Sequence, residues 1–277
     1  MNIHLVTVVG SHIDLLPHML RHYRELGIDS LVLNVHLEKY GDPLYESILE
    51  VAKTYDAKIG CVFAGKWLQS VNPFLYAQSR DKRPKDWFIL ADVDEFQVYP
   101  RPLRQFLGEM EKAGYDYVEG CVIDRIARDG SFPEVKQEVP LWEQFPLAGM
   151  ITYPLLGANI QKVVAAKGLV KLGPGQHFAR NGIGCPRERE YIPVHHFKWF
   201  KDLVVRLRKR VEFYKAENES IWAESQRFVD YCETHSGRID VSDPQLLLVE
   251  SAKDYVLWDQ VKRMVLAHPA AAGRKSA

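Results

Sequence analysis

The chain has 277 residues, of which 47% are apolar, and its 36 acidic side chains balance 36 basic ones. This composition indicates a globular protein with a sizeable core, and the balanced charge gives no argument for a nucleic-acid partner. Its four cysteines are widely spread and form no CxxC pair, so the sequence suggests neither a zinc site nor a disulfide framework. Because no apolar run is long enough to span a bilayer and no secretory leader opens the chain, we expect a soluble, cytoplasmic protein.

Strands and helices are predicted to alternate through the first hundred residues. Continuous apolar runs predict buried strands, and apolar residues at helical spacing between them predict helices. The predicted strands are residues 3–9, 31–35, 59–63 and 87–91, and the predicted helices are 16–26, 42–55 and, less regularly, 71–79. Such alternation implies right-handed crossovers and an α/β fold with a mostly parallel sheet flanked by helices.

The remainder of the chain shows a different organisation. We expect a helix over 102–112, a strand over 117–123, an irregular proline- and aromatic-rich stretch over 131–154, and strands within 162–172. Helices are predicted at 203–214, 221–231 and 245–265. This pattern predicts a main domain, 1–200, with halves 1–99 and 100–200, followed by a C-terminal helical extension, 201–277.

The most informative stretch is WFILADVDEF, residues 87–96, in which an apolar strand runs directly into acidic residues. Side chains two apart on an extended segment share a face, so Asp92 and Asp94 are expected to point the same way while Val93 points into the core. Two carboxylates held so close repel unless a cation neutralises them, which predicts a divalent-metal site. The alternative is that these acids cap a turn ahead of Pro100 and Pro102.

A nucleotide is expected beside this acidic stretch, because ligands of open α/β sheets bind outside the carboxyl ends of the strands. Thr7 and Val9 end the first strand, Asn34 ends the second, and with Asp92 they are the predicted nucleotide-binding residues. The chain contains no GxGxxG or Walker A loop. The phosphates would therefore be held mainly by the metal and by basic side chains.

Four segments in order, WFILADVDEF, VEGCVIDRIARDG, GQHF and HHFKW, resemble the family-2-like glycosyltransferases with a GT-A fold, in the branch whose DxD is followed by Glu-Phe. The resemblance covers roughly residues 3–210. It implies a Rossmann-like nucleotide-sugar half, a variable acceptor half, and transfer of a sugar from a nucleoside-diphosphate sugar to a saccharide or other hydroxyl acceptor. It also implies Mn2+ or Mg2+ as cofactor and, for most relatives, inversion of the anomeric centre.

The resemblance also suggests roles for individual residues. Asp92 corresponds to the acid that faces the ribose and the waters of the metal, and Asp94 to the direct metal ligand. His177 and His196 are the two candidates for completing the metal shell. The metal would act as a Lewis acid on the leaving diphosphate.

An inverting transfer needs a base near the acceptor hydroxyl. Asp124 is our choice, with a salt-bridge or turn acid as the alternative interpretation. Asp129, Glu134 and Glu143 are substitutes, and without a base a retaining mechanism stays open.

Two other functions compete with this assignment. A metal-dependent nucleotidyltransferase could use the same acids, although Gly10 and Ser11 make a poor version of its glycine-rich loop. A non-catalytic carbohydrate-binding module of the same fold is the third possibility. The basic run between Lys198 and Arg210 is consistent with diphosphate neutralisation, a solvated helix face or peripheral contact with an anionic membrane.

Overall fold

The computed structural model describes residues 1–267, and these form two compact units. The first unit contains Met1–Cys121 and Gln161–Val194, and the second contains Val122–Ile160 and the chain from His195 onwards. Two strands, β6 (Tyr117–Ile126) and β9 (Ile192–His196), therefore belong in part to each unit. The predicted domain boundary at residue 200 stays a prediction, and residues 268–277 of the predicted extension lie outside the described part of the chain.

The sheet of the first unit is built on a block of parallel strands. β1 (Ile3–Val9) pairs in parallel with β2 (Ser30–Leu37) on one side and β4 (Trp87–Leu90) on the other, and β2 pairs in parallel with β3 (Ala57–Ala64). β8 (Gln161–Lys167) runs antiparallel to β4, and the first part of β6 runs antiparallel to β8. The short strand β5 (Glu95–Gln97) pairs with β9. The four strands predicted in the first hundred residues are thus confirmed.

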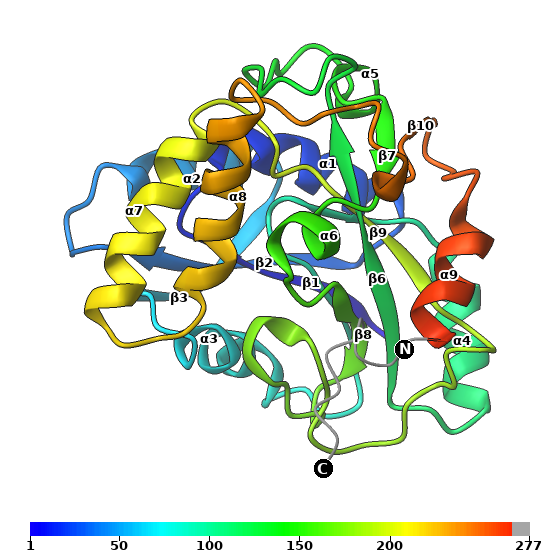
Figure 1. Ribbon diagram of the computed structural model, residues 1–277. Helices are drawn as coiled ribbons and strands as arrows, with labels where there is room; N and C mark the ends of the chain where they lie inside the picture. The colour runs from blue at the N-terminus through cyan, green and yellow to red at the C-terminus, as the bar shows by residue number, and fades with distance from the viewer. Residues whose placement is uncertain (268–277) are drawn as a thin grey trace. The chain divides into compact units, whose positions relative to one another are not determined.

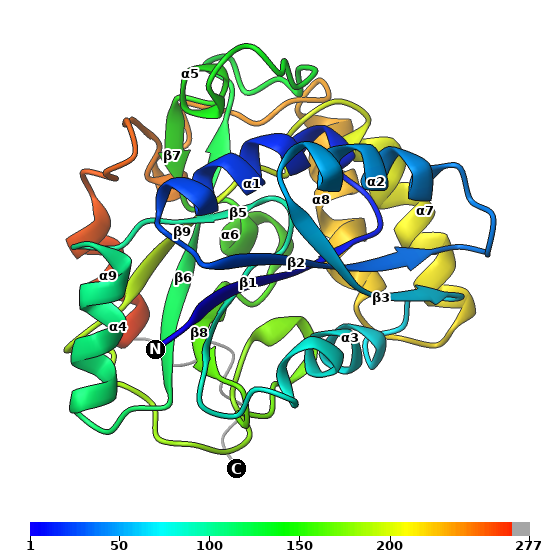
Figure 2. The ribbon, with the colours of Figure 1, turned by 180° about the vertical axis from the view of Figure 1, so that it is seen from behind.

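Helices cover both faces of this sheet (Figures 1 and 2). α1 (Leu16–Glu25) and α2 (Leu44–Thr54) lie on one face, and α3 (Val71–Arg80) lies on the other. Alternate residues of β1, Val6 and Val8, pack with Leu75 and Tyr76 of α3 in one buried cluster. α4 (Leu103–Lys112) precedes β6. The predicted α/β class, with a mostly parallel sheet flanked by helices, is confirmed.

The second unit is largely helical around a core of its own. α7 (Leu203–Ala216) packs on α8 (Trp222–Thr234), and α8 also packs on the short α6 (Thr152–Leu156) (Figure 1). β7 (Leu147–Gly149) lies between the end of β6 and β10 (Val249–Glu250), antiparallel to both. α5 (Leu141–Gln144) and α9 (Trp258–Ala267) are the other α-helices described in this unit. The buried cluster includes Ile126, Ile151, Trp199, Phe228, Ile239 and Leu246.

The long helix predicted over 245–265 is wrong. A 3-10 turn (Pro244–Leu246), strand β10 and then α9 occupy this stretch. Leu247 adopts a left-handed backbone conformation with φ 49°, which ends any helix there. Val249 and Glu250 then pair with β7, a strand roughly a hundred residues earlier. The spacing of apolar residues within a segment cannot predict such a distant partner. The stretch 131–154, predicted to be irregular, likewise contains α5, β7 and most of α6.

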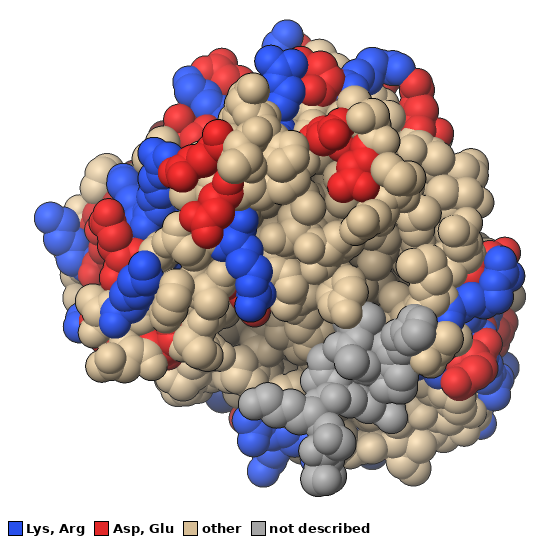
Figure 3. Space-filling view, viewed as in Figure 1, with Lys and Arg blue, Asp and Glu red and all other residues tan. Residues whose placement is uncertain are grey.

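Between residues 1 and 267, every helix is too short or too polar to cross a bilayer. On the face seen in Figure 3, basic and acidic side chains are interspersed rather than gathered by sign. One exposed pair joins the two long helices of the second unit, where the Arg208 guanidinium lies 3.1 Å from Glu233 Oε1. The basic run of α7 is therefore partly neutralised by its own neighbours.

Candidate active site

The carboxyl ends of β1 and β4 mark the point at which the strand order of the first unit reverses. From β1 the chain proceeds to β2 and β3 on one side, whereas β4 pairs with β1 on the other side. Ligands of open α/β sheets bind outside such a reversal. His12 follows β1 and Asp94 follows β4, and His12 Nε2 lies 4.0 Å from Asp94 Oδ2. The loops after these two strands therefore meet where a ligand is expected.

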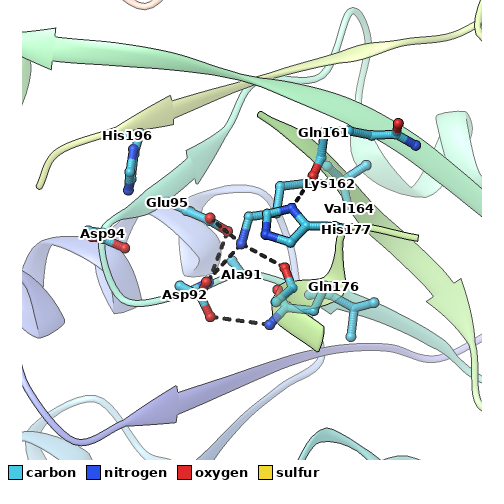
Figure 4. Close-up of polar contacts among 12 residues, drawn as sticks. Ala91, Asp92, Asp94, Glu95, Gln161, Lys162, Val164, Gln176, His177 and His196 are labelled. Carbon is cyan, nitrogen blue, oxygen red and sulfur yellow. Dashed lines mark hydrogen bonds and ion pairs between the residues drawn. The ribbon is translucent and has the colours of Figure 1, made fainter. Parts of the chain in front are cut away.

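The acidic residues after β4 form a turn rather than an extended strand. β4 ends at Leu90, and the Asp92 carbonyl accepts a hydrogen bond from the Glu95 N–H at 2.9 Å. Alternation of side chains between two faces does not apply to such a turn. Asp94 lies apart from Asp92 (Figure 4), so the prediction that both carboxylates point the same way is wrong. Val93 is buried, as predicted.

A buried lysine supplies the positive charge between two of the acids. Lys162 Nζ, from β8, donates to Asp92 Oδ2 at 2.8 Å, lies 2.7 Å from Glu95 Oε1 and donates to the Gly175 carbonyl at 3.0 Å (Figure 4). Only 7% of the Lys162 side chain is exposed, compared with 2% for Glu95 and 33% for Asp92. These three partners use the three N–H donors of an ammonium group.

The remaining oxygens of the two acids also have partners. Asp92 Oδ1 accepts from Gln176 Nε2 at 3.2 Å and from the Tyr76 hydroxyl at 3.3 Å. Glu95 Oε2 accepts from the Asp92 backbone N–H at 3.1 Å. Burial alone lowers the pKa of Lys162, but the charges of Asp92 and Glu95 outweigh it and raise that pKa above its ordinary value. The lysine is therefore a cation at neutral pH.

The loop after β8 completes this cluster, and its backbone conformation requires a glycine. Gly175 has φ 61°, and a Cβ atom there would lie 2.7 Å from the His177 ring. His177 Nδ1 donates to the Gln161 carbonyl at 2.7 Å. Burial, together with the nearby charge of Lys162, lowers the pKa of His177 to about 4, so its imidazole is neutral at pH 7.

In the second unit, Asp124 is a buried acceptor for several donors. Its side chain is 1% exposed, and it accepts from the backbone N–H groups of Ile151 and Thr152 at 2.9 and 2.6 Å, and from Trp199 Nε1 at 2.8 Å. His196 Nδ1 lies 3.1 Å from Asp124 Oδ1. Burial by itself raises the pKa of Asp124, but the hydrogen bond and charge of His196, with Lys198 and Thr152, lower it to about 2. A carboxylate this stabilised is a weak base.

The predicted nucleotide contacts on the strands are buried. Thr7, Val9 and Asn34 are each 0% exposed. Asn34 ties three elements together, because its Nδ2 donates to the Leu75 carbonyl at 2.8 Å while its Oδ1 accepts from Ser79 at 2.7 Å and from Cys61 at 3.3 Å. Within the described residues, the Thr7 hydroxyl has no hydrogen-bond partner. Their role in nucleotide binding stays a prediction.

The implied Mn2+ or Mg2+ does not fit the carboxylates at Asp92 and Glu95. Within residues 1–267, no three His, Cys, Asp or Glu side chains gather with the geometry of a metal site. The ammonium of Lys162 already lies where a metal would neutralise Asp92 and Glu95. The metal roles of Asp92, Asp94, His177 and His196 therefore stay predictions.

The sequence offered one overlooked signal for this cluster. Lys162 begins an apolar strand, KVVAA, and a lysine in a buried strand is rare unless it is paired. Its partners are some seventy residues earlier, beyond the reach of any local pattern.

Comparisons with known proteins give only weak similarities. No family model matches the chain, and no curated protein does. A structure of S. aureus TarS, residues 1–349, is 9% identical with a TM-score of 0.39, covering 88% of this chain and 77% of that one. The same fragment in complex with UDP-GlcNAc gives 7% identity and a TM-score of 0.39, covering 85% and 72%.

A Bacillus anthracis protein described as a glucose-1-phosphate thymidylyltransferase gives 8% identity and a TM-score of 0.31, covering 50% of this chain. The present chain spans 61% of that protein's length. These similarities are too weak to assign a function.

Proposed function

We propose that this chain transfers a sugar from a nucleoside-diphosphate sugar to an acceptor hydroxyl. The observation that carries the proposal is the acidic turn Asp92–Glu95, which follows β4 at the reversal of strand order, where nucleotides bind in open α/β folds. The resemblance of WFILADVDEF and its downstream segments to family-2-like glycosyltransferases supports the same assignment. Uridine diphosphate sugars are the first donors to test.

Within the first unit, Asp92 and Asp94 take different roles in this proposal. Asp92 is one-third exposed although Lys162 holds one of its oxygens, so its carboxylate can accept a ribose hydroxyl. Asp94 is only 11% exposed in its side chain and lies next to His12 of the β1 loop, so it is assigned to the diphosphate end of the donor. The binding of Mn2+ or Mg2+ by Asp94 stays a prediction.

We propose that His196, rather than Asp124, accepts the proton of the acceptor hydroxyl. Asp124 is saturated by donors and holds His196 Nδ1. When Nδ1 carries the proton, Nε2 is the basic nitrogen of the ring. We expect His196→Gln to lower kcat roughly 100-fold or more while the KM for the donor changes little. An equal fall in donor affinity would instead place His196 among the nucleotide contacts.

A donor panel tests the proposal directly. Purified protein is incubated with uridine, guanosine and thymidine diphosphate sugars, with and without Mn2+, and release of the nucleoside diphosphate is measured together with thermal shifts. Release from one donor class supports a transferase. Pyrophosphate release from a nucleoside triphosphate and a sugar 1-phosphate would identify a nucleotidyltransferase instead, and saccharide binding without turnover would identify a binding module.

Asp94→Ala is the most informative substitution to test in this assay. We expect it to reduce donor turnover by about 100-fold or more, because a carboxylate can favour an anionic leaving group only through a positive partner that it holds, His12 or a bound cation, and such a contact acts mainly in the transition state. Asp81→Ala, an exposed acid after α3, serves as the control and should keep wild-type turnover. Wild-type turnover in Asp94→Ala, with an unchanged melting temperature, would remove Asp94 from the site.

A further inference from the structure

We propose that Lys162 is a built-in cation that takes the place of a divalent metal at Asp92 and Glu95. Its ammonium lies within 2.8 Å of both carboxylates and is 7% exposed. This inference concerns the charge balance at the end of β4 and holds whether or not the chain is a glycosyltransferase.

The charge balance at this position explains why a cation is required. Asp92 and Glu95 are three residues apart in a tight turn, and Glu95 is 2% exposed, so two neighbouring negative charges would otherwise lie in a poorly solvated place. One ammonium group neutralises half of this charge and contacts both carboxylates. A divalent ion shared by the same two oxygens would occupy the same position as Nζ and would meet the positive charge of the lysine.

The surrounding loop is shaped to hold the lysine rather than a metal. The carbonyl of Gly175 accepts the third N–H of Lys162, and the Gln176 side-chain amide donates to Asp92. Both residues have a left-handed backbone, with φ 61° and 54°, which is uncommon for a glutamine. Amide and carbonyl dipoles thus complete the contacts of the ion-paired group (Figure 4).

Removal of the lysine should create a metal site at Asp92 and Glu95. In Lys162→Ala, Asp92 and Glu95 lose their cation and gain room for one. We expect the melting temperature in EDTA to fall by roughly 5–15 °C, because one partner of a buried ion pair is removed. Millimolar Mn2+ should then restore at least half of this fall. Adding Asp92→Asn to Lys162→Ala should abolish that restoration.

Lys167→Ala is the matched control. Lys167 lies on the same strand and pairs with Asp116 at 3.5 Å, but it is 22% exposed. We expect a change of at most about 2 °C and the same response to Mn2+ as in the wild type.

A second measurement needs only well-folded proteins. The wild type and Asp92→Asn are titrated with Mn2+, and bound metal is followed by electron paramagnetic resonance. If Lys162 replaces the metal, both proteins bind Mn2+ equally, whatever the contribution of Asp94. A Mn2+ site in the wild type that disappears in Asp92→Asn would overturn the proposal, as would a Lys162→Ala protein that folds but does not respond to Mn2+. Neither result depends on donor turnover, so failure here is distinguishable from failure of the proposed function.

Discussion

Asp124, predicted from the sequence as the catalytic base, has contacts that favour a structural role, while its role as a base stays a prediction. The position after a strand and before an arginine suggested a base, but five donor atoms from four residues surround its carboxylate. The sequence could not reveal this, because Ile151, Thr152 and Trp199 approach from distant segments. Lys162 was not predicted to belong to the site, because its two acidic partners are equally remote in sequence.

The depressed pKa of Asp124 predicts a specific pH dependence of stability. A carboxyl group whose pKa is about 2 when folded and about 4 when unfolded stabilises the fold above pH 4, and this contribution is lost as the pH falls through 2. The contribution is about 2 kcal/mol. Asp124→Asn should therefore be destabilised at pH 7, and the difference from wild type should narrow below pH 3, as measured by urea unfolding. Asp254→Asn, at an exposed position, should match the wild type throughout. A difference that stays constant down to pH 2.5 would contradict the assignment.

At the scale of elements, the strands that are apolar throughout were predictable and the ends of elements were not. β1 and β4 are buried throughout and read as continuous apolar runs, as parallel strands do, whereas β2 contains Asn34 and His36 and β3 is only partly buried. The prediction for the acids failed two residues past β4, at Asp92. The hydrogen bond from the Glu95 N–H to the Asp92 carbonyl turns the chain there, and the local sequence pattern does not predict this bond. β10 was missed because a strand of two residues is too short to show a periodic pattern, and its partner, β7, is distant in the sequence.

Glycines within elements give a testable contrast. A Cβ atom at Gly120 of β6 would lie 2.3 Å from the Ile192 carbonyl and 2.8 Å from the Val164 side chain, so a backbone would have to move. We expect Gly120→Ala to cost about 2 kcal/mol or more. At Gly108 of α4 a Cβ atom meets nothing within 4 Å, and Gly108→Ala should stabilise the protein by about 0.5–1 kcal/mol. Denaturant midpoints of the two variants should move in opposite directions, and equal shifts would contradict the packing of β6 against β9.

At the scale of the whole molecule, the predicted boundary at residue 200 divides the core of the second unit. Ile126 and Ile151 come from before the boundary, and Phe228 and Leu246 come from after it, yet all belong to one buried cluster. Trp199, just before the boundary, is 0% exposed, and its ring centroid lies 4.8 Å from that of Phe228. The boundary at residue 200 stays a prediction, and the shared cluster makes it testable by truncation.

Truncation tests whether residues 1–200 can fold without the helices that follow. We expect this fragment to be largely insoluble, or soluble without a cooperative melting transition, because burial of several large apolar side chains at roughly 1.5–3 kcal/mol each is lost with α7 and α8. Fragment 1–267, which ends with the described residues, is the control and should melt like the full chain. Soluble yield, near-ultraviolet circular dichroism and thermal unfolding distinguish the two cases. A fragment 1–200 that unfolds cooperatively near the melting temperature of the full chain would show that the helices after residue 200 are an appendage, and that the core around Trp199 is dispensable for folding.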